Sequence, residues 1–204
     1  MNKERIKIIC ESALAVALCV AFNFIQIRLP INLAGGSISL VMLPIAIVAL
    51  RRGPGVGALI GLVFGIIDLL IDPYIVHWVQ IILDYPLPYL LFGFGVGLFK
   101  PLLRAVKKKG AKTAVIIISF LIGGALRFCS HLVSGVIFFG SSAPVDQNVW
   151  LWSGLYQCSY LLPSLIAVCI LTIILVPVLE KVIPSQPKDK QEMGEERTDP
   201  PDAQ

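Results

Sequence analysis

The sequence predicts an all-α integral membrane protein with six transmembrane helices and both termini in the cytoplasm. The chain of 204 residues is 56% hydrophobic and only 15% charged, with a mean hydropathy of +0.83. That composition is too apolar for a soluble domain of this size. The apolar residues form six runs, and the basic residues are concentrated on alternate connections between them. Both patterns are typical of a multi-pass membrane protein.

The six apolar runs cover residues 5–27, 37–50, 54–72, 77–99, 112–139 and 150–180. The second run is short and the last two are long, so we expect tilted helices or ends that project from the bilayer. The first run is too long for the core of a signal peptide and no small-residue cleavage site follows it. No cleavable signal is therefore predicted.

The distribution of positive charge sets the orientation. Fifteen of the 17 Lys and Arg residues lie at or before the start of the first run, between the second and third runs, between the fourth run and the start of the fifth, or after the sixth. The opposite connections hold only Arg28, and Arg127 lies inside the fifth run. Basic loops stay in the cytoplasm, so both termini are placed there. This bias also accounts for the net charge of +4, and no nucleic-acid partner is predicted.

Two regions follow from composition. Residues 1–184 contain the six apolar runs and are predicted to form one transmembrane domain, and the polar, charged residues 185–204 are predicted to be a disordered cytoplasmic tail. The five cysteines show no metal-ligand spacing, so they are interpreted as small core residues and no metal or cofactor is expected.

The first run carries a stripe of small residues, Ala13, Ala17 and Ala21, spaced four apart on one helical face. Such a stripe allows another helix to approach closely. From spacing alone, packing against helices of the same chain is the simpler interpretation, and contact with a separate membrane protein is the alternative.

The first outer connection contains Pro30, Gly35 and Gly36, followed by Ser39. Residues of these types allow the chain to turn tightly or to fold over the mouth of a cavity.

The fourth run contains an unusual carboxylate, Asp84, within an apolar segment. An ionised Asp at mid-bilayer costs about 3 kcal/mol, so it marks a functional site unless it is paired. Helical spacing places His77, Gln80 and Asp84 near one face, and Pro86 is expected to kink the helix just beyond. An ion pair between Asp84 and Arg127 is the structural alternative.

The fifth and sixth runs add polar and aromatic groups in their outer halves. Arg127, His131 and Ser134 share one face of the fifth, with Phe139 further out, while Trp152 and Gln157 lie in the sixth. An aromatic belt at the membrane surface explains Trp152 without a ligand. Taken with Asp84, these groups predict a pocket open to the outside for a flat, cationic ligand, bound by charge pairing and stacking.

These residues resemble the thiamine-specific substrate-binding (S) components of energy-coupling factor (ECF) transporters, the ThiT/YuaJ family. The resemblance runs from the first apolar run to the end of the sixth and rests on several motifs in the same order: the Ala stripe after Glu11, Leu43–Gly53, Tyr74, Leu83–Tyr85, Arg127–His131, Ser134–Phe139 and Leu155–Pro163.

The resemblance implies a six-helix S-component bundle in the plasma membrane of a bacterium, with no ATPase or other enzymatic activity of its own. Such proteins bind thiamine from outside and associate with a transmembrane coupling subunit and two cytoplasmic ATPases, which alone use ATP. The Ala stripe would then contact the coupling subunit, and Gly35 to Ser39 would form a lid. The implied ligand contacts are Tyr74, Asp84, Tyr85, His131, Phe139, Trp152 and Gln157.

Four positions differ from the familiar family pattern: Asp84, Gln157, Phe139 and Ser39. An S component for another vitamin or a thiamine precursor therefore stands as an alternative. A solitary proton-coupled carrier that uses Asp84 and His131 is another. An intramembrane enzyme is the third, and against it we find no hydrolase motif and no second buried carboxylate.

Overall fold

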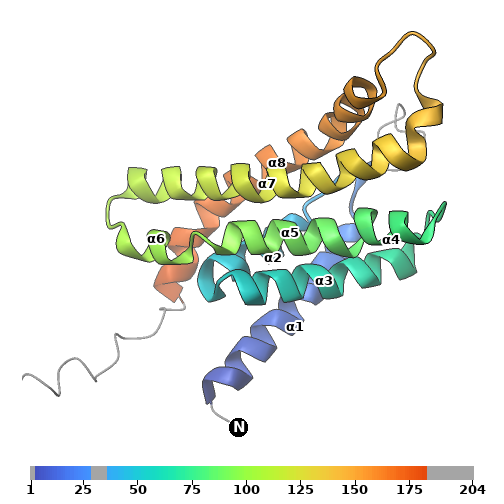
Figure 1. Cartoon of the computed structure of the whole chain (residues 1–204). Helices are drawn as coiled ribbons and strands as arrows, with labels where there is room; N and C mark the ends of the chain where they lie inside the picture. Colours follow the sequence, from blue (N-terminus) through green and yellow to red (C-terminus); the bar gives the residue numbers. More distant parts are fainter. Residues whose placement is uncertain (1–2, 29–35, 183–204) are drawn as a thin grey trace, which may run out of the picture.

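The computed structural model describes residues 3–28 and 36–182, which are almost entirely helical (Figure 1). The predicted tail, residues 185–204, and Gly35 of the predicted lid lie outside the described residues.

The six predicted helical segments are present as α1 (Lys3–Asn23), α2 (Met42–Arg52), α3 (Pro54–Ile71), α4 with α5 (Trp78–Asp84 and Pro86–Gly97), α7 (Lys109–Phe139) and α8 (Val149–Val182). Shorter elements are α6 (Lys100–Ala105), the 3-10 turn η1 (Gly140–Ser142), and strands β1 (Ile27–Arg28) and β2 (Ser37–Ile38).

Five of the helical segments in the described part are long and apolar enough to cross a membrane. The exception is α2, whose 11 residues extend about 16 Å at 1.5 Å per residue. Eight of those residues are buried, because α2 packs against α1, α3, α5 and α8. It is a short helix enclosed by the bundle, and it supplies much of the apolar core.

Helices α3 and α5 lie side by side along much of their length (Figure 1). Gly57 and Gly61 of α3 allow this approach, because an added Cβ would overlap the backbone carbonyls of Gly93 and Tyr89 on α5. In a bilayer, where the hydrophobic effect does not join helices, such backbone proximity supplies the packing energy. The contact brings the outer end of α3 next to the start of α5.

The predicted kink in the fourth run is confirmed. Helix α4 ends at Asp84 and α5 begins at Pro86, with Tyr85 between them at φ −110° and ψ −79°. Because Pro86 has no N–H to continue the helix, the last turn of α4 has carbonyls free for other partners. The carbonyl of Leu83 accepts a hydrogen bond from Ser130 Oγ of α7 at 2.7 Å.

The basic connections lie together at one end of the bundle. Lys100 Nζ donates to the carbonyl of Arg52 at 3.0 Å, and Arg104 Nη2 donates to the carbonyl of Arg51 at 3.2 Å. In Figure 1, α6 lies at this end, whereas α4 and the α7–α8 connection lie at the other. The positive charges and the predicted pocket therefore occupy opposite ends of the molecule.

The Ala stripe on α1 is exposed. Ala13, Ala17 and Ala21 all face outward, while Ala15 and Cys19 are buried against the bundle. The interpretation that the stripe packs against helices of the same chain is therefore wrong for the described structure.

Candidate functional site: an outward-facing cavity

A cavity of about 420 Å³ lies at the end of the bundle opposite the basic connections. Its walls come from the outer ends of α1, α2, α3, α4, α5, α7 and α8, together with β2. The described residues that the sequence singled out for ligand contact all line it: Tyr74, Asp84, Tyr85, His131, Phe139, Trp152, Gln157 and Ser39. Segments far apart in the sequence thus converge on one space of a size suited to a small molecule.

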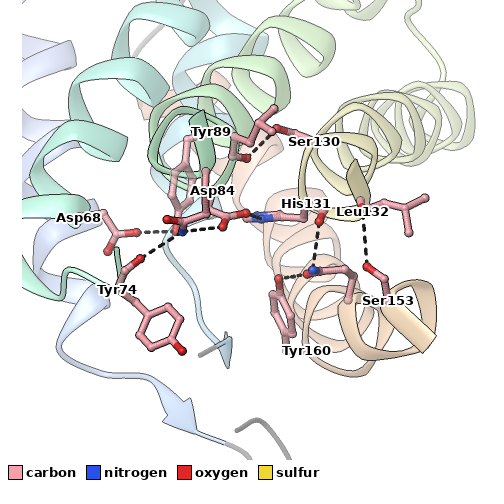
Figure 2. Close-up of polar contacts among 12 residues, drawn as sticks. Asp68, Tyr74, Asp84, Tyr89, Ser130, His131, Leu132, Ser153 and Tyr160 are labelled. Atoms are coloured by element: carbon pink, nitrogen blue, oxygen red, sulfur yellow. Dashed lines mark hydrogen bonds and ion pairs between the residues drawn. The ribbon is translucent and has the colours of Figure 1, made fainter. Parts of the chain in front are cut away.

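Asp84 is held by an amide and an imidazole (Figure 2). Gln80 Nε2 donates to Asp84 Oδ2 at 2.8 Å, and His131 Nδ1 lies 3.4 Å from Asp84 Oδ1. His131 is only 7% exposed, and its Nε2 is enclosed without a hydrogen-bond partner in the part of the chain that the structure describes. The helix break after Asp84 and the inward face of α7 bring these groups together.

The alternative ion pair between Asp84 and Arg127 is not formed. Arg127 instead lies over the ring of Tyr89, with Cζ 4.0 Å from the ring centroid. Its side chain is buried and lines the cavity, yet Nε and Nη1 have no hydrogen-bond partner among the described residues. Asp84 is therefore not neutralised by this arginine through direct contact.

A second carboxylate lines the cavity, which corrects the expectation that there was none. Asp68, partly buried near the end of α3, accepts hydrogen bonds from Asn23 Nδ2 at 2.8 Å and from the Tyr89 hydroxyl at 3.2 Å. The signal was present in the sequence, because Asp68 interrupts the apolar run 54–72. Asp72, one turn further on, also lines the cavity.

Gln157 of α8 is tied to its neighbours. Its Nε2 donates to the backbone carbonyl of His131 at 3.2 Å, and its Oε1 accepts a hydrogen bond from the hydroxyl of Tyr160. Both Gln157 and Tyr160 are buried. The amide therefore joins α7 to α8 at the cavity wall, and among the described residues it leaves one N–H available for a ligand.

Aromatic rings surround the mouth of the cavity. Tyr74 stacks on Phe139 at 6.0 Å, and Trp152 stacks on Tyr156 at 5.9 Å. The hydroxyl of Tyr85 accepts from the Tyr74 N–H at 2.7 Å and donates to the carbonyl of Asp72 at 3.1 Å. These contacts fasten the α3–α4 connection beside the cavity.

His77 does not share the helical face of Gln80 and Asp84, contrary to the expectation from spacing. It precedes α4 as its N-cap, where Nδ1 accepts from the N–H of Val79 at 3.1 Å. Its ring stacks on Phe138 at 5.2 Å, and it is not among the residues that line the cavity.

The described end of the first outer connection is attached to α8. The Ser39 N–H donates to Ser164 Oγ at 3.2 Å. Gly36 has φ +93° and lies so close to the ring of Tyr160 that a Cβ there would overlap it. Both the positive φ and the close approach favour glycine. Strand β2 therefore forms part of the cavity wall.

The cavity combines negative charge with aromatic surface. Asp68, Asp72 and Asp84 carry three carboxylates, and Arg127 is the only Lys or Arg among the described residues that line it. Aromatic faces attract cations through the ring quadrupole. The arrangement is suited to binding a flat cation of small-molecule size.

Comparison with known proteins gives a consistent result. Residues 9–184 match the family model described as thiamine transporter protein (Thia_YuaJ). Thiamine transporter ThiT of Bacillus subtilis (strain 168) is 33% identical over 178 residues, which cover 85% of this chain and 92% of that protein. Thiamine transporter ThiT of Lacticaseibacillus paracasei is 29% identical over 187 residues, covering 89% of this chain and 90% of that protein.

A solved structure agrees with these sequence relatives. The structure of ThiT from Listeria monocytogenes superposes with a TM-score of 0.78 at 27% identity and covers 88% of this chain and 98% of that one. The similarity therefore extends through the helical bundle and includes the elements that form the cavity.

Proposed function

This chain belongs to the thiamine transporter (Thia_YuaJ) family, and from that membership we propose that it is the S component of an ECF-type importer, which binds thiamine from outside the plasma membrane. Its relatives are named as transporters, so the enzyme alternative is set aside. The observation that carries the proposal is the convergence of Asp84, His131 and several aromatic rings on one cavity.

The chemistry of thiamine matches these groups. Its thiazolium ring is cationic and flat, and its aminopyrimidine carries hydrogen-bond donors and acceptors. In this proposal Asp84 offsets the positive charge, Tyr74, Tyr85, Phe139 and Trp152 provide stacking surface, and His131 and Gln157 provide directional hydrogen bonds. The contact between Ser39 and Ser164 supports a role for the first outer connection next to the bound ligand.

Fluorescence titration tests ligand identity. The three tryptophans are Trp78, Trp150 and Trp152, and of these Trp152 lines the cavity. We expect thiamine to quench the fluorescence of the purified protein at micromolar concentration or below. Replacing both Trp78 and Trp150 with Phe should retain that change, since neither residue lines the cavity. A response to another vitamin or a precursor, and none to thiamine, would favour the alternative ligand.

Delivery of thiamine to the cytoplasm is proposed to require an ATP-driven module composed of a coupling subunit and two ATPases. The exposed stripe of Ala13, Ala17 and Ala21 provides the flat helical face that a second membrane protein needs for close contact. Uptake by vesicles should require the ATPase module.

A solitary proton-coupled carrier is favoured by one observation, the 3.4 Å approach of His131 to Asp84, because such a pair can exchange a proton. Proteoliposomes that contain only this chain separate the two functions. Thiamine accumulation driven by a proton gradient would support the solitary carrier, and binding without accumulation would support the S component.

A further inference from the structure

Two charged groups in the cavity wall were not among the contacts predicted from the sequence: the carboxylate of Asp68 on α3 and the guanidinium of Arg127 on α7. Both contact the same residue, Tyr89 of α5. The Tyr89 hydroxyl donates to Asp68 Oδ2 at 3.2 Å, and the Tyr89 ring faces Arg127 Cζ at 4.0 Å. One aromatic side chain therefore holds an anion and a cation next to each other.

Asp68 is fixed in position but has capacity for further hydrogen bonds. Its Oδ1 accepts from Asn23 Nδ2 at 2.8 Å and its Oδ2 accepts from Tyr89. A carboxylate offers about four lone-pair sites, so each oxygen can accept another donor. Figure 2 shows Asp68 and Asp84 approaching one space from different helices.

Arg127 lacks the partners that a buried guanidinium normally has. The residue is 7% exposed, and its Nε and Nη1 are enclosed without a hydrogen-bond acceptor in residues 3–28 and 36–182. It forms no ion pair with Asp68 in that part of the chain. The third nitrogen, Nη2, is not among the enclosed unpaired atoms and can face the cavity that Arg127 lines. A ligand acceptor at Nη2 would give the guanidinium a charge-assisted hydrogen bond, while Nε and Nη1 stay enclosed.

The two sides of the cavity differ in charge. Asp68 and Arg127 carry opposite charges, so as a pair they offer an acceptor and a donor with little net charge, while Asp72 lines the cavity one turn further along the chain. Asp84 contacts Gln80 and His131 and no Lys or Arg side chain among the described residues. Its negative charge is therefore available to a cation. A ligand that fits both sides needs a cationic part and a neutral part that presents a donor beside an acceptor.

We propose that Asp68 and Arg127 bind the amino-substituted edge of the ligand's pyrimidine ring. Asp68 accepts a hydrogen bond from the exocyclic amino group, and Arg127 donates to the adjacent ring nitrogen. Asp84 then lies near the cationic ring. This inference rests on the proposed function, because it identifies which side of the cavity each half of thiamine occupies, and it makes Asp68 a specificity-determining residue.

The test compares thiamine with oxythiamine, in which an oxo group replaces the exocyclic amino group. Both are titrated into the wild-type protein, into Asp68→Asn, and into Asp146→Asn, a control that removes an exposed acid of the α7–α8 connection. Wild type and Asp146→Asn should prefer thiamine by about tenfold or more, as expected when a charge-assisted hydrogen bond distinguishes two ligands. Asp68→Asn should lose most of that preference, because its amide can donate to the oxo group.

The outcomes separate this inference from the proposed function. If the wild type binds neither compound, the proposed function fails. If the wild type binds thiamine but does not distinguish it from oxythiamine, or if Asp68→Asn weakens both equally or neither, the role of Asp68 is overturned while the function stands.

A second variant covers the case in which Asp68→Asn does not fold. Tyr89→Phe keeps the charge of Asp68 and the ring beneath Arg127, but removes one of the two hydrogen bonds that position the carboxylate. It should reduce the preference for thiamine over oxythiamine. An unchanged preference in folded Tyr89→Phe would overturn the inference.

Discussion

At the residue scale, Asp84 is the acid whose environment is best defined. It ends α4 directly before the break at Tyr85, and its two oxygens face different partners, His131 and Gln80. Neither partner is an arginine or lysine, so the carboxylate can offset the charge of a cation that enters the cavity. The helix break and the packing of α7 together set this geometry.

Asp84→Asn should weaken thiamine binding roughly ten- to a hundredfold, which corresponds to about 1–3 kcal/mol for a lost charged hydrogen-bond partner. Asp84→Glu keeps the charge on a side chain one methylene longer and should retain most of the affinity. Fluorescence titration provides the affinities, and thermal melting of each variant in detergent shows whether it is folded. An affinity for Asp84→Asn equal to that of the wild type would remove Asp84 from the binding site.

The sequence could identify Asp84 and His131 because polar residues in apolar runs are conspicuous. It could not identify their partners. The pairing of Arg127 with Tyr89 depends on how α5 packs against α7. The alternative Asp84–Arg127 ion pair, which is wrong, was suggested only because both residues were placed at a similar depth in the membrane. Asp68 was missed although it interrupts its run, because its contacts with Asn23 and Tyr89 come from separate helices.

At the scale of elements, the α3–α5 contact positions the acidic wall of the cavity. Gly61→Ala places a Cβ against the backbone of Tyr89, which cannot rotate away as a side chain can. Overpacking of this kind costs about 1–3 kcal/mol, so we expect lower thermal stability. Gly55→Ala on the same helix meets nothing within 4 Å and should leave the melting temperature unchanged or slightly raised. Equal melting temperatures for the two variants would show that this close contact is not required.

Helix α1 presents the surface proposed for the coupling subunit. Ala17→Trp should reduce ATP-dependent uptake by the assembled transporter, because a large side chain blocks close helix approach. It should leave thiamine binding by the isolated chain unchanged, since Ala17 does not line the cavity. The matched control is Leu121→Trp, a substitution at an exposed site on α7. If both variants reduce uptake equally, the stripe has no specific role.

At the scale of the whole molecule, α1 is attached to the bundle at its outer end and near its middle, with the Ala stripe exposed between the attachments. At the outer end Asn23 donates to Asp68 in the cavity wall. Toward the basic end Arg52 contacts Glu11 through Nε and Nη2, each at 2.7 Å. From the sequence, the charge of Arg52 served only to predict orientation, and no pattern indicated that this residue also pairs with α1. Such contacts between distant segments depend on the packed structure.

The contact with Glu11 gives Arg52 a structural role in addition to its effect on membrane orientation. Its side chain is 13% exposed and that of Glu11 is 21% exposed, so the pair is partly shielded from water and has two parallel hydrogen bonds. Arg52→Gln should therefore lower stability by about 1 kcal/mol, more than a typical exposed ion pair contributes.

Lys107→Gln removes one exposed positive charge at the same end of the molecule and should not alter the melting temperature. Thiamine affinity should remain the same in both, because neither residue lines the cavity. Equal stability of the two variants would mean that Arg52 contributes only positive charge at this end. A loss of thiamine affinity in Arg52→Gln would instead show that the position of α1 affects the cavity through Asn23 and Asp68.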